Sequence, residues 1–183
     1  GVMGAAALRS FFGQTALFHP DVRTGADGVA HVEFKLPDTI TTWRVTARGV
    51  TRDTQLGEKR TTLVSSLPFW AELVTPTELE EGDALQPLVR VHNHEDRRLE
   101  VRLALATGSG APVERTVEAA AMSTVEVLFD RVDVPPRGQG PLRFELTAQA
   151  GDRADRVRKD VAVRPRGVRE EFLATGALER IAT

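Results

Sequence analysis

The stretch Leu36-Pro37-Asp38-Thr39-Ile40-Thr41-Thr42-Trp43-Arg44-Val45 lies at a corner between two alternating runs of apolar and polar residues. The run before it, residues 30–36, is typical of a strand with one buried face. Pro37 lacks a backbone donor and Asp38 can bond its own backbone, so this pair should end that strand. Thr41, Thr42 and Trp43 favour β-structure, so a second strand should start at once. The stretch therefore predicts two half-buried strands that meet at a corner, with Trp43 covering them.

The rest of residues 11–65 offers short runs only. Residues 11–18 contain a first apolar cluster, residues 24–28 predict a hairpin-type turn through Asp27-Gly28, and residues 60–64 predict a further strand after a loop. About four strands are too few for an independent sandwich, which needs about seven. Residues 1–10 are small and read as a tether, so this part of the chain looks incomplete by itself.

Residues 67–165 contain seven short alternating runs separated by turns. The runs are 69–74, 85–91, 99–105, 113–117, 125–129, 142–148 and 157–163. Regular alternation with Gly, Pro, Asn and Asp between the runs predicts an antiparallel β-sandwich that folds alone. Residues 119–122 are interpreted as a β-connection rather than a helical turn, and residues 78–81 as a solvated loop. The fold class predicted for the chain is therefore all-β, built from antiparallel sandwich domains of fibronectin or immunoglobulin type.

The segment from Phe11 to Thr51 resembles the alpha-2-macroglobulin family, which includes complement components and bacterial protease-trapping homologues. The residues at which the family pattern and this chain agree are Phe12, Thr15, Ala16, Phe18, Pro20, Thr24, Asp27, Gly28, residues 32–34, Leu36, Pro37, Asp38, Thr41, Thr42, Trp43 and Arg44. The chain departs from the pattern at Gln14, where an acidic residue is usual; at Phe18 it keeps the aromatic character of the pattern, although Trp is commoner there. We expect these motif residues to have structural roles rather than catalytic ones.

The resemblance implies a division into three parts. Residues 1–66 would be the C-terminal half of a macroglobulin-like domain that carries a protease-sensitive bait region upstream. Residues 67–165 would be a complete macroglobulin-like sandwich, and residues 166–183 the start of a CUB-type domain. The partners it implies are proteases, bound by the full-length protein, and the neighbouring macroglobulin-like, CUB and thioester domains. In the family, bait cleavage rearranges the domains and entraps the protease.

Composition narrows the remaining classes of function. Lys and Arg number 24 against 26 Asp and Glu, for a formal charge of −2, so no basic field favours nucleic acid. The chain has no Cys, which excludes disulfides, thiolate metal sites and the family's Cys-Gly-Glu-Gln thioester from this stretch. No apolar run reaches the ~20 residues of a membrane span. Residues 1–8 are too short for a signal peptide, so we interpret the chain as an interior piece of a longer protein.

Few residues suggest chemistry. His92-Asn93-His94, followed by two acidic residues, could share a zinc ion, but a solvated turn with Asn93 at the bend is the simpler interpretation. The serines fall at boundaries or turns, without a base beside them, and Gly138-Gln139-Gly140 precedes a strand rather than a helix. We therefore predict no enzyme activity, no cofactor and no metal. Trp43 and Trp70 are expected in core or interdomain packing, with residues 11–65 covering whichever of Phe69 and Trp70 faces outward.

Two hypotheses of different classes follow. The first is a structural part of an alpha-2-macroglobulin-like protease inhibitor, in which stiff sandwiches transmit a shape change. The second is a pair of fibronectin-like binding modules of a bacterial adhesin or scaffold, which does not explain the motif at residues 36–44. The Arg-rich, Cys-free composition suggests a bacterial, extracytoplasmic protein in the periplasm or on the cell surface, with any membrane anchor upstream of residue 1.

Overall fold

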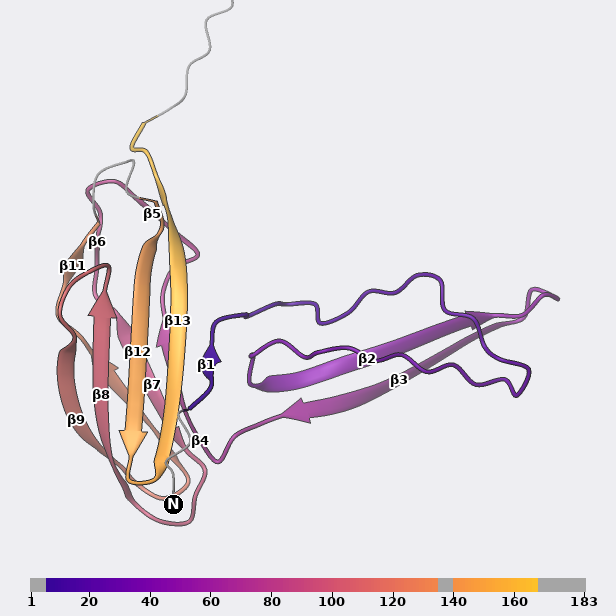
Figure 1. Cartoon of the computed structure of the whole chain (residues 1–183), viewed down its shortest axis with the longest axis horizontal. Helices are drawn as coiled ribbons and strands as arrows, with labels where there is room; N and C mark the ends of the chain where they lie inside the picture. Colours follow the sequence, from indigo (N-terminus) through magenta and orange to yellow (C-terminus); the bar gives the residue numbers. More distant parts are fainter. Residues whose placement is uncertain (1–5, 135–139, 168–183) are drawn as a thin grey trace, which may run out of the picture.

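The chain folds as strands, in a computed structural model that describes residues 6–134 and 140–167. Within these ranges there are thirteen strands and no helix (Figure 1). The strands are β1 (Leu8–Arg9), β2 (Thr41–Val50), β3 (Leu56–Ser65), β4 (Phe69–Val74), β5 (Glu78–Glu80), β6 (Ala84–Leu85), β7 (Leu88–Asn93), β8 (Leu99–Thr107), β9 (Val113–Ala119), β10 (Ser123–Leu128), β11 (Val132–Asp133), β12 (Leu142–Ala150) and β13 (Arg153–Arg164). The predicted all-β class is confirmed.

Two sheets form the sandwich. The larger has the order β1-β13-β12-β8-β9, with β5 also pairing with β13, and the smaller has the order β10-β7-β4. Pairing is antiparallel except for β1 and β5, which lie parallel to β13. A short β6–β11 pair lies at one end of the sandwich (Figure 1). Strand β4 ends the smaller sheet and contacts β13 of the larger one, so these two strands bring the sheets together along one side.

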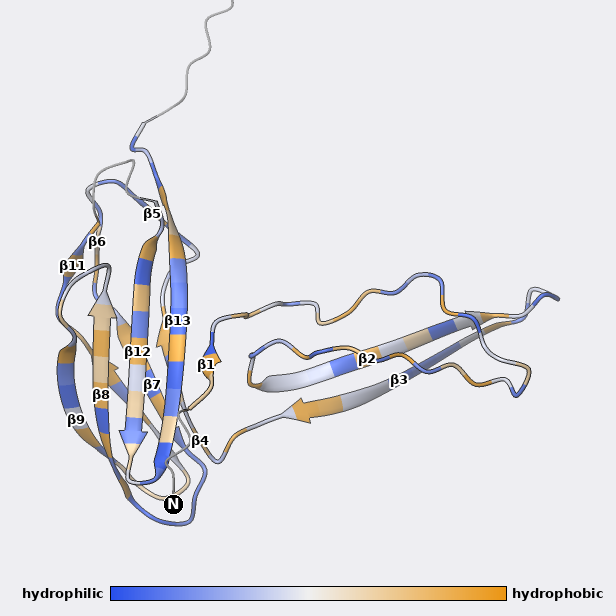
Figure 2. Cartoon of the chain, viewed as in Figure 1, coloured by the Kyte–Doolittle hydropathy of each residue, from blue (hydrophilic) through white to orange (hydrophobic). Residues whose placement is uncertain are grey.

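The core lies between the two sheets. Along β8 and β12 the apolar residues are buried and the polar residues between them are exposed, and Figure 2 shows this alternation along the ribbons. Leu103 and Phe144 are both 0% exposed. All members of the buried apolar cluster lie between Phe69 and Val161, with Phe12 packed against it from outside. Burying such side chains contributes about 1.5–3 kcal/mol each, so the core is the main source of the sandwich's stability.

Residues 11–65 are arranged differently. Strands β2 and β3 form a long antiparallel hairpin that projects away from the sandwich, and an irregular segment, residues 10–40, runs beside it (Figure 1). Trp43 pairs with Leu63 across the hairpin, as an alternating strand at this position requires. The turn at Asp27-Gly28 forms as predicted: Gly28 has φ +78° and donates its N–H to the Gly25 carbonyl at 3.0 Å.

The prediction of a strand over residues 30–36 was wrong. The segment carries no strand, and residues 30–35 are exposed, with Phe34 at 43%. An alternating pattern becomes a strand only where a neighbouring strand accepts its backbone hydrogen bonds, and no described strand pairs with this segment. Residues 11–65 therefore contain two strands rather than about four, and the apolar cluster expected at residues 11–18 is mostly open, with Phe18 83% exposed.

Smaller differences have local causes. Residues 78–81, expected to be a solvated loop, contribute β5, because Leu79 turns into the core at 7% exposed. The run expected over 85–91 is divided between β6 and β7, since Pro87 cannot donate to a sheet. The tether expected over residues 1–10 contains β1, and its Arg9 is buried. The β-connection at residues 119–122 forms, with Met122 at φ 51° between β9 and β10.

Candidate functional site

A buried ion pair joins β1 to the sandwich. Arg9 is 9% exposed and Asp155 of β13 is 4% exposed. The Arg9 Nε donates to Asp155 Oδ1 at 2.8 Å, and Nη2 donates to Oδ2 at 2.5 Å. This fork-to-carboxylate geometry is the strong form of a charge-assisted hydrogen bond. If one partner were removed, the other would remain as a buried charge without a counter-ion, which is energetically costly. The pair therefore favours attachment of β1 at the position where Arg9 meets Asp155.

The same side chains form hydrogen bonds with backbone groups of β4 on the edge that is not paired with a neighbouring strand. Ala71 pairs with Val91 of β7, yet its own N–H donates to Asp155 Oδ2 at 2.8 Å. Its carbonyl accepts from Arg9 Nη2 at 2.6 Å. Two residues along, the Leu73 carbonyl accepts a hydrogen bond from Lys159 Nζ. Three backbone groups on this edge, the Ala71 N–H and the carbonyls of Ala71 and Leu73, are therefore paired with charged side chains instead of another strand.

Aromatic rings surround the two cations. The Arg9 guanidinium carbon lies 5.8 Å from the Trp70 ring centroid and 5.9 Å from that of Phe12, within the range of cation–π attraction. The Lys159 Nζ lies 5.6 Å from the Phe12 ring. Burial lowers the pKa of Lys159 and the positive charge of Arg9 adds to this, while the carboxylate of Glu72 opposes it.

Trp70 faces outward from the sandwich, while its neighbour Phe69 is buried at 4% exposed. One side of the pair thus turns away from the core, as the sequence predicts. The Trp70 ring stacks on His92 of β7, with centroids 3.8 Å apart and planes 6° apart. The groups placed against the Trp70 ring are thus His92 and Arg9. Residues 11–65 were expected to cover this ring, and Arg9 lies just before them in the chain.

The Leu36-Pro37-Asp38 motif holds the segment that follows Arg9. Asp38 Oδ2 accepts the backbone N–H of Ser10 and of Phe11, each at 2.9 Å, and the Asp38 N–H donates to the Phe11 carbonyl at 2.7 Å. The Asp38 carbonyl accepts from Arg9 Nη1 at 3.4 Å. The carboxylate thus binds the backbone of a distant segment and not, as proposed from the sequence, its own.

The environment of Asp38 favours its charged form. Partial burial acts to raise the pKa of its carboxyl group, but hydrogen bonds from the Phe11 and Ser10 backbone, with the charges of Lys35 and Arg9, lower it overall. The adjacent Pro37 is buried. A Cβ added to Gly13 would lie 3.3 Å from the Pro37 ring, so the two segments are closely packed here. We call this whole contact, made by Arg9, Asp38, Ala71, Asp155 and Lys159, the joint.

The other motif residues lie outside the joint. Thr41, Thr42, Trp43 and Arg44 begin β2, with Trp43 half-buried. Thr15, Ala16, Pro20 and Gly28 lie in the irregular segment. Of the motif, Asp38 takes part in the joint, next to the buried Pro37. For the motif residues in the projecting hairpin and in the irregular segment beside it, a structural role stays a prediction.

Three residues of the joint, Arg9, Asp155 and Lys159, were not predicted from the sequence. A signal existed for two of them: Asp155 and Lys159 fall in the same alternating frame as Val157 and Val161, which places charges on the buried face of β13. A charged residue at a core position needs a partner. Arg9 lies in a stretch without periodicity, so nothing in the sequence pointed to it.

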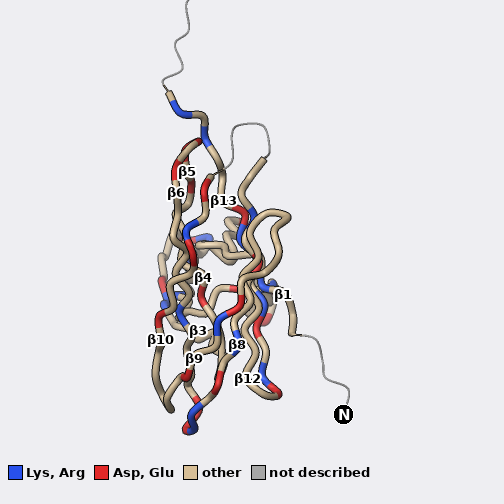
Figure 3. Tube along the Cα trace, turned by 90° about the vertical axis from the view of Figure 1, so that its left-hand side faces the viewer, with Lys and Arg blue, Asp and Glu red and all other residues tan. Residues whose placement is uncertain are grey.

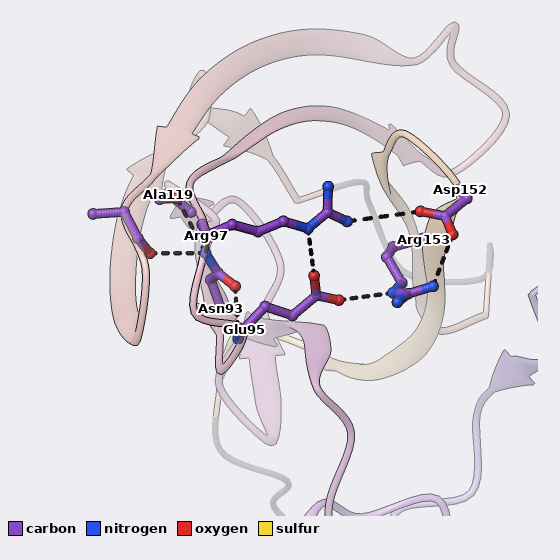
Figure 4. Close-up of polar contacts among 7 residues, drawn as sticks. Asn93, Glu95, Arg97, Ala119, Asp152 and Arg153 are labelled. Atoms are coloured by element: carbon purple, nitrogen blue, oxygen red, sulfur yellow. Dashed lines mark hydrogen bonds and ion pairs between the residues drawn. The ribbon is translucent and has the colours of Figure 1, made fainter.

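The expected solvated turn with Asn93 at its bend was wrong in detail: His92 and Asn93 end β7, and the bend follows at residues 95–97, held by the buried Asn93 side chain. Asn93 is 0% exposed, and its amide donates to the carbonyls of Arg97, Ala119 and Ala120, while its Oδ1 accepts from the Glu95 N–H (Figure 4). Figure 4 also shows Glu95 between two arginines, Arg97 at 2.8 Å and Arg153 at 2.7 Å. Hydrogen bonds from Arg153 and Arg97 lower the pKa of Glu95. No group of three or more potential metal ligands occurs in the described ranges.

The surface charges do not define a further site. Along the tube in Figure 3, basic and acidic residues are interspersed over the strands of the sandwich. Many are paired across neighbouring strands, such as Arg143 with Asp160 at 2.8 Å and Arg90 with Glu126 at 2.8 Å. Among the described residues there is no helix long and apolar enough to cross a membrane.

Fold and joint together define an all-β structural module, in which a projecting hairpin region is fixed to a two-layer sandwich. A family profile described as "Alpha-2-macroglobulin family" matches residues 15–105, which include the Leu36-to-Arg44 motif. Curated relatives agree over nearly the whole chain. An alpha-2-macroglobulin homolog of a Nostoc species is 26% identical over 178 residues, covering 94% of this chain, and one of Deinococcus radiodurans is 29% identical over 176 residues, covering 95%. The chain belongs to the alpha-2-macroglobulin family.

Solved structures share the fold. The trypsin-activated alpha-2-macroglobulin of Escherichia coli matches 84% of this chain with a TM-score of 0.62 and 18% identity. A mutant alpha-2-macroglobulin of Salmonella matches 77% with a TM-score of 0.51 and 24% identity. The chain spans 9% and 17% of the lengths of the Nostoc and Deinococcus relatives, and 12% and 10% of the two crystallised chains. The similarity therefore concerns one stretch of much larger proteins.

Proposed function

We propose that this chain is a structural part of an alpha-2-macroglobulin-like, broad-range protease inhibitor that traps proteases after its bait region is cut. The observation that carries the proposal is the family match over residues that include Asp38, whose carboxylate fixes residues 10 and 11. Family membership favours this hypothesis over fibronectin-like adhesin modules.

In this proposal residues 1–66 are the C-terminal half of a bait-bearing macroglobulin-like domain. The open hairpin supports it: apolar side chains of β2 and β3 are exposed, Val45 at 38% and Leu63 at 42%. A second layer supplied by the upstream half-domain would cover them, as the two layers of a sandwich do. Residues 67–165 are a complete macroglobulin-like domain. The proposed CUB-type start, residues 166–183, lies almost wholly outside the described residues, which end at 167.

The proposed role is mechanical. The joint attaches the segment that would follow the bait to a sandwich whose core moves as one body. A rearrangement begun by bait cleavage would then pass through the joint to the CUB and thioester domains. We assign no bond-making step to this chain, and we place the full-length protein outside the cytoplasm, in the periplasm or on the cell surface.

The test is digestion of the full-length protein that contains this chain with several unrelated proteases. We expect a shared early cut upstream of residue 1, a faster-migrating product on native gels, and protease retained with that product. Catalytically inactivated proteases are the matched control and should leave migration unchanged. Cuts scattered through interdomain loops, with no change in migration, would contradict the proposal.

A further inference from the structure

Strand β1 is attached to the sandwich chiefly by one side chain. It is two residues long and pairs with β13 only at Arg156 and Val157. Leu8 remains 36% exposed, whereas Arg9 is 9% exposed. The buried apolar core contains no residue of β1. Displacing β1 would therefore remove no residue from the core.

The position that Arg9 fills is specific for a guanidinium group. Its three nitrogens reach four oxygens: both Asp155 carboxylate oxygens, the Ala71 carbonyl and the Asp38 carbonyl, at 2.5–3.4 Å. A lysine ammonium is a single nitrogen and cannot span this set. Asp155, 4% exposed, is already oriented by the Ala71 N–H at 2.8 Å. The carboxylate belongs to the sandwich, and the cation comes from the added strand.

We infer that the side of the sandwich where β4 and β13 meet is a docking site for an extended, arginine-bearing strand, filled here by Leu8–Arg9 and able to release it. Recognition would combine backbone pairing with β13 and the guanidinium contacts to Asp155 and Ala71, the general form of strand addition to a sheet. When β1 leaves, water reaches Asp155 and solvates its charge, so release does not require the sandwich to unfold. The inference does not depend on protease trapping.

The test uses the full chain carrying Trp43→Phe, which leaves Trp70 as the single tryptophan. Its ring centroid lies 5.8 Å from the Arg9 guanidinium carbon, so its fluorescence should report whether an arginine occupies the site. The ligand is a capped peptide of residues 6–13, titrated into the chain with and without Arg9→Ala while tryptophan fluorescence is recorded. We expect binding at least about tenfold tighter to the Arg9→Ala chain, because its own β1 no longer competes. The peptide with lysine in place of arginine should bind at least about tenfold more weakly to that chain.

Two controls keep the result interpretable. Adding Asp155→Asn to the Arg9→Ala chain should remove the preference for arginine over lysine. Hydrogen exchange at core amides such as Val101 should stay slow in Arg9→Ala, while exchange at Ala71 accelerates, which separates release of β1 from unfolding. If Arg9→Ala does not fold, Arg9→Lys replaces it. The same changes in peptide affinity and hydrogen exchange are then expected, but smaller. Equal binding of both peptides, no binding to the variant, or loss of core protection in both Arg9 variants would overturn the inference.

Discussion

Residues 69–164 and residues 11–65 carry similar alternating patterns but bury them to different extents. In β12, Leu142, Phe144 and Leu146 are at most 6% exposed. In the hairpin, Val45 and Leu63 are 38% and 42% exposed. The difference is a second layer: β12 faces the small sheet across a core, and the hairpin has no opposing sheet among the described residues. The alternation therefore shows which face of a strand is apolar. That face stabilises the fold only where a second layer buries it.

The largest expected effect separates the two regions directly. Phe144→Ala should lower the free energy of unfolding of the sandwich by about 3–5 kcal/mol, because it leaves a cavity in a closed core. Phe18→Ala, at a side chain 83% exposed, should change it by less than about 0.5 kcal/mol. Urea unfolding of the full chain, followed by tryptophan fluorescence, measures both. Similar losses for the two variants would mean that residues 11–65 pack more tightly than the structure indicates.

Next in size is the buried amide of the sandwich. Asn93→Ala should cost about 2–3 kcal/mol, since the carbonyls of Arg97, Ala119 and Ala120 lose their donor. Ser109→Ala, in the exposed turn between β8 and β9, is the control and should be nearly neutral. Chemical denaturation distinguishes them. A neutral Asn93→Ala would show that this turn holds without the amide.

A smaller effect concerns the joint. Asp38→Ala should weaken the attachment of the Ser10–Phe11 segment by about 1–2 kcal/mol, through loss of two backbone hydrogen bonds. Hydrogen exchange at these two amides should accelerate while core amides keep their protection. Asp21→Ala, at an exposed carboxylate, is the matched control. Unchanged exchange at Ser10 and Phe11 would argue against the anchoring role of Asp38.

The joint should also weaken in acid. Because the folded pKa of Asp38 lies below its ordinary value of 3.8, its contribution is complete above that value and is lost as the pH falls through the folded pKa. Exchange at the Ser10 amide, corrected for the intrinsic pH dependence of exchange, should therefore rise at the acid end. Asp38→Asn should flatten this dependence, and an identical profile in the variant would contradict it.

The smallest effect is a pH dependence of the sandwich. Burial lowers the pKa of His92 below its ordinary 6.5, with the charges of His94 and Arg90 adding to the shift and Glu72 opposing it. The unfolded chain then binds more protons near that pH, so stability should fall slightly as the pH drops below about 6.5. His92→Gln should reduce the slope of unfolding free energy against pH, measured by urea unfolding at several pH values. A slope unchanged from that of the original chain would rule out His92 as the source.

The parts of the fold that could be predicted from the sequence are those in which a second layer covers the apolar face of a strand. The strands containing Leu99–Leu105 and Leu142–Ala148 were predictable, because their periodicity matches a face that the core covers. The strand expected at residues 30–36 was not observed, since periodicity carries no information on whether a neighbour exists. The role of Asp38 was missed for a related reason: its hydrogen-bond partners, Ser10 and Phe11, are distant in sequence and contribute only backbone groups. Asp155 could have been detected, because it is a charged residue at a position that the alternation of β13 assigns to the buried face.

The capped edge of β4 also affects what other molecules can do to this sheet. Aggregation through β-structure begins when a foreign strand bonds to free backbone groups at an edge. Here the Ala71 N–H and the carbonyls of Ala71 and Leu73 are bonded to Asp155, Arg9 and Lys159, so an incoming chain would first have to displace three charged side chains. The sandwich is thereby protected against polymerising along this edge for as long as its N-terminal strand stays in place.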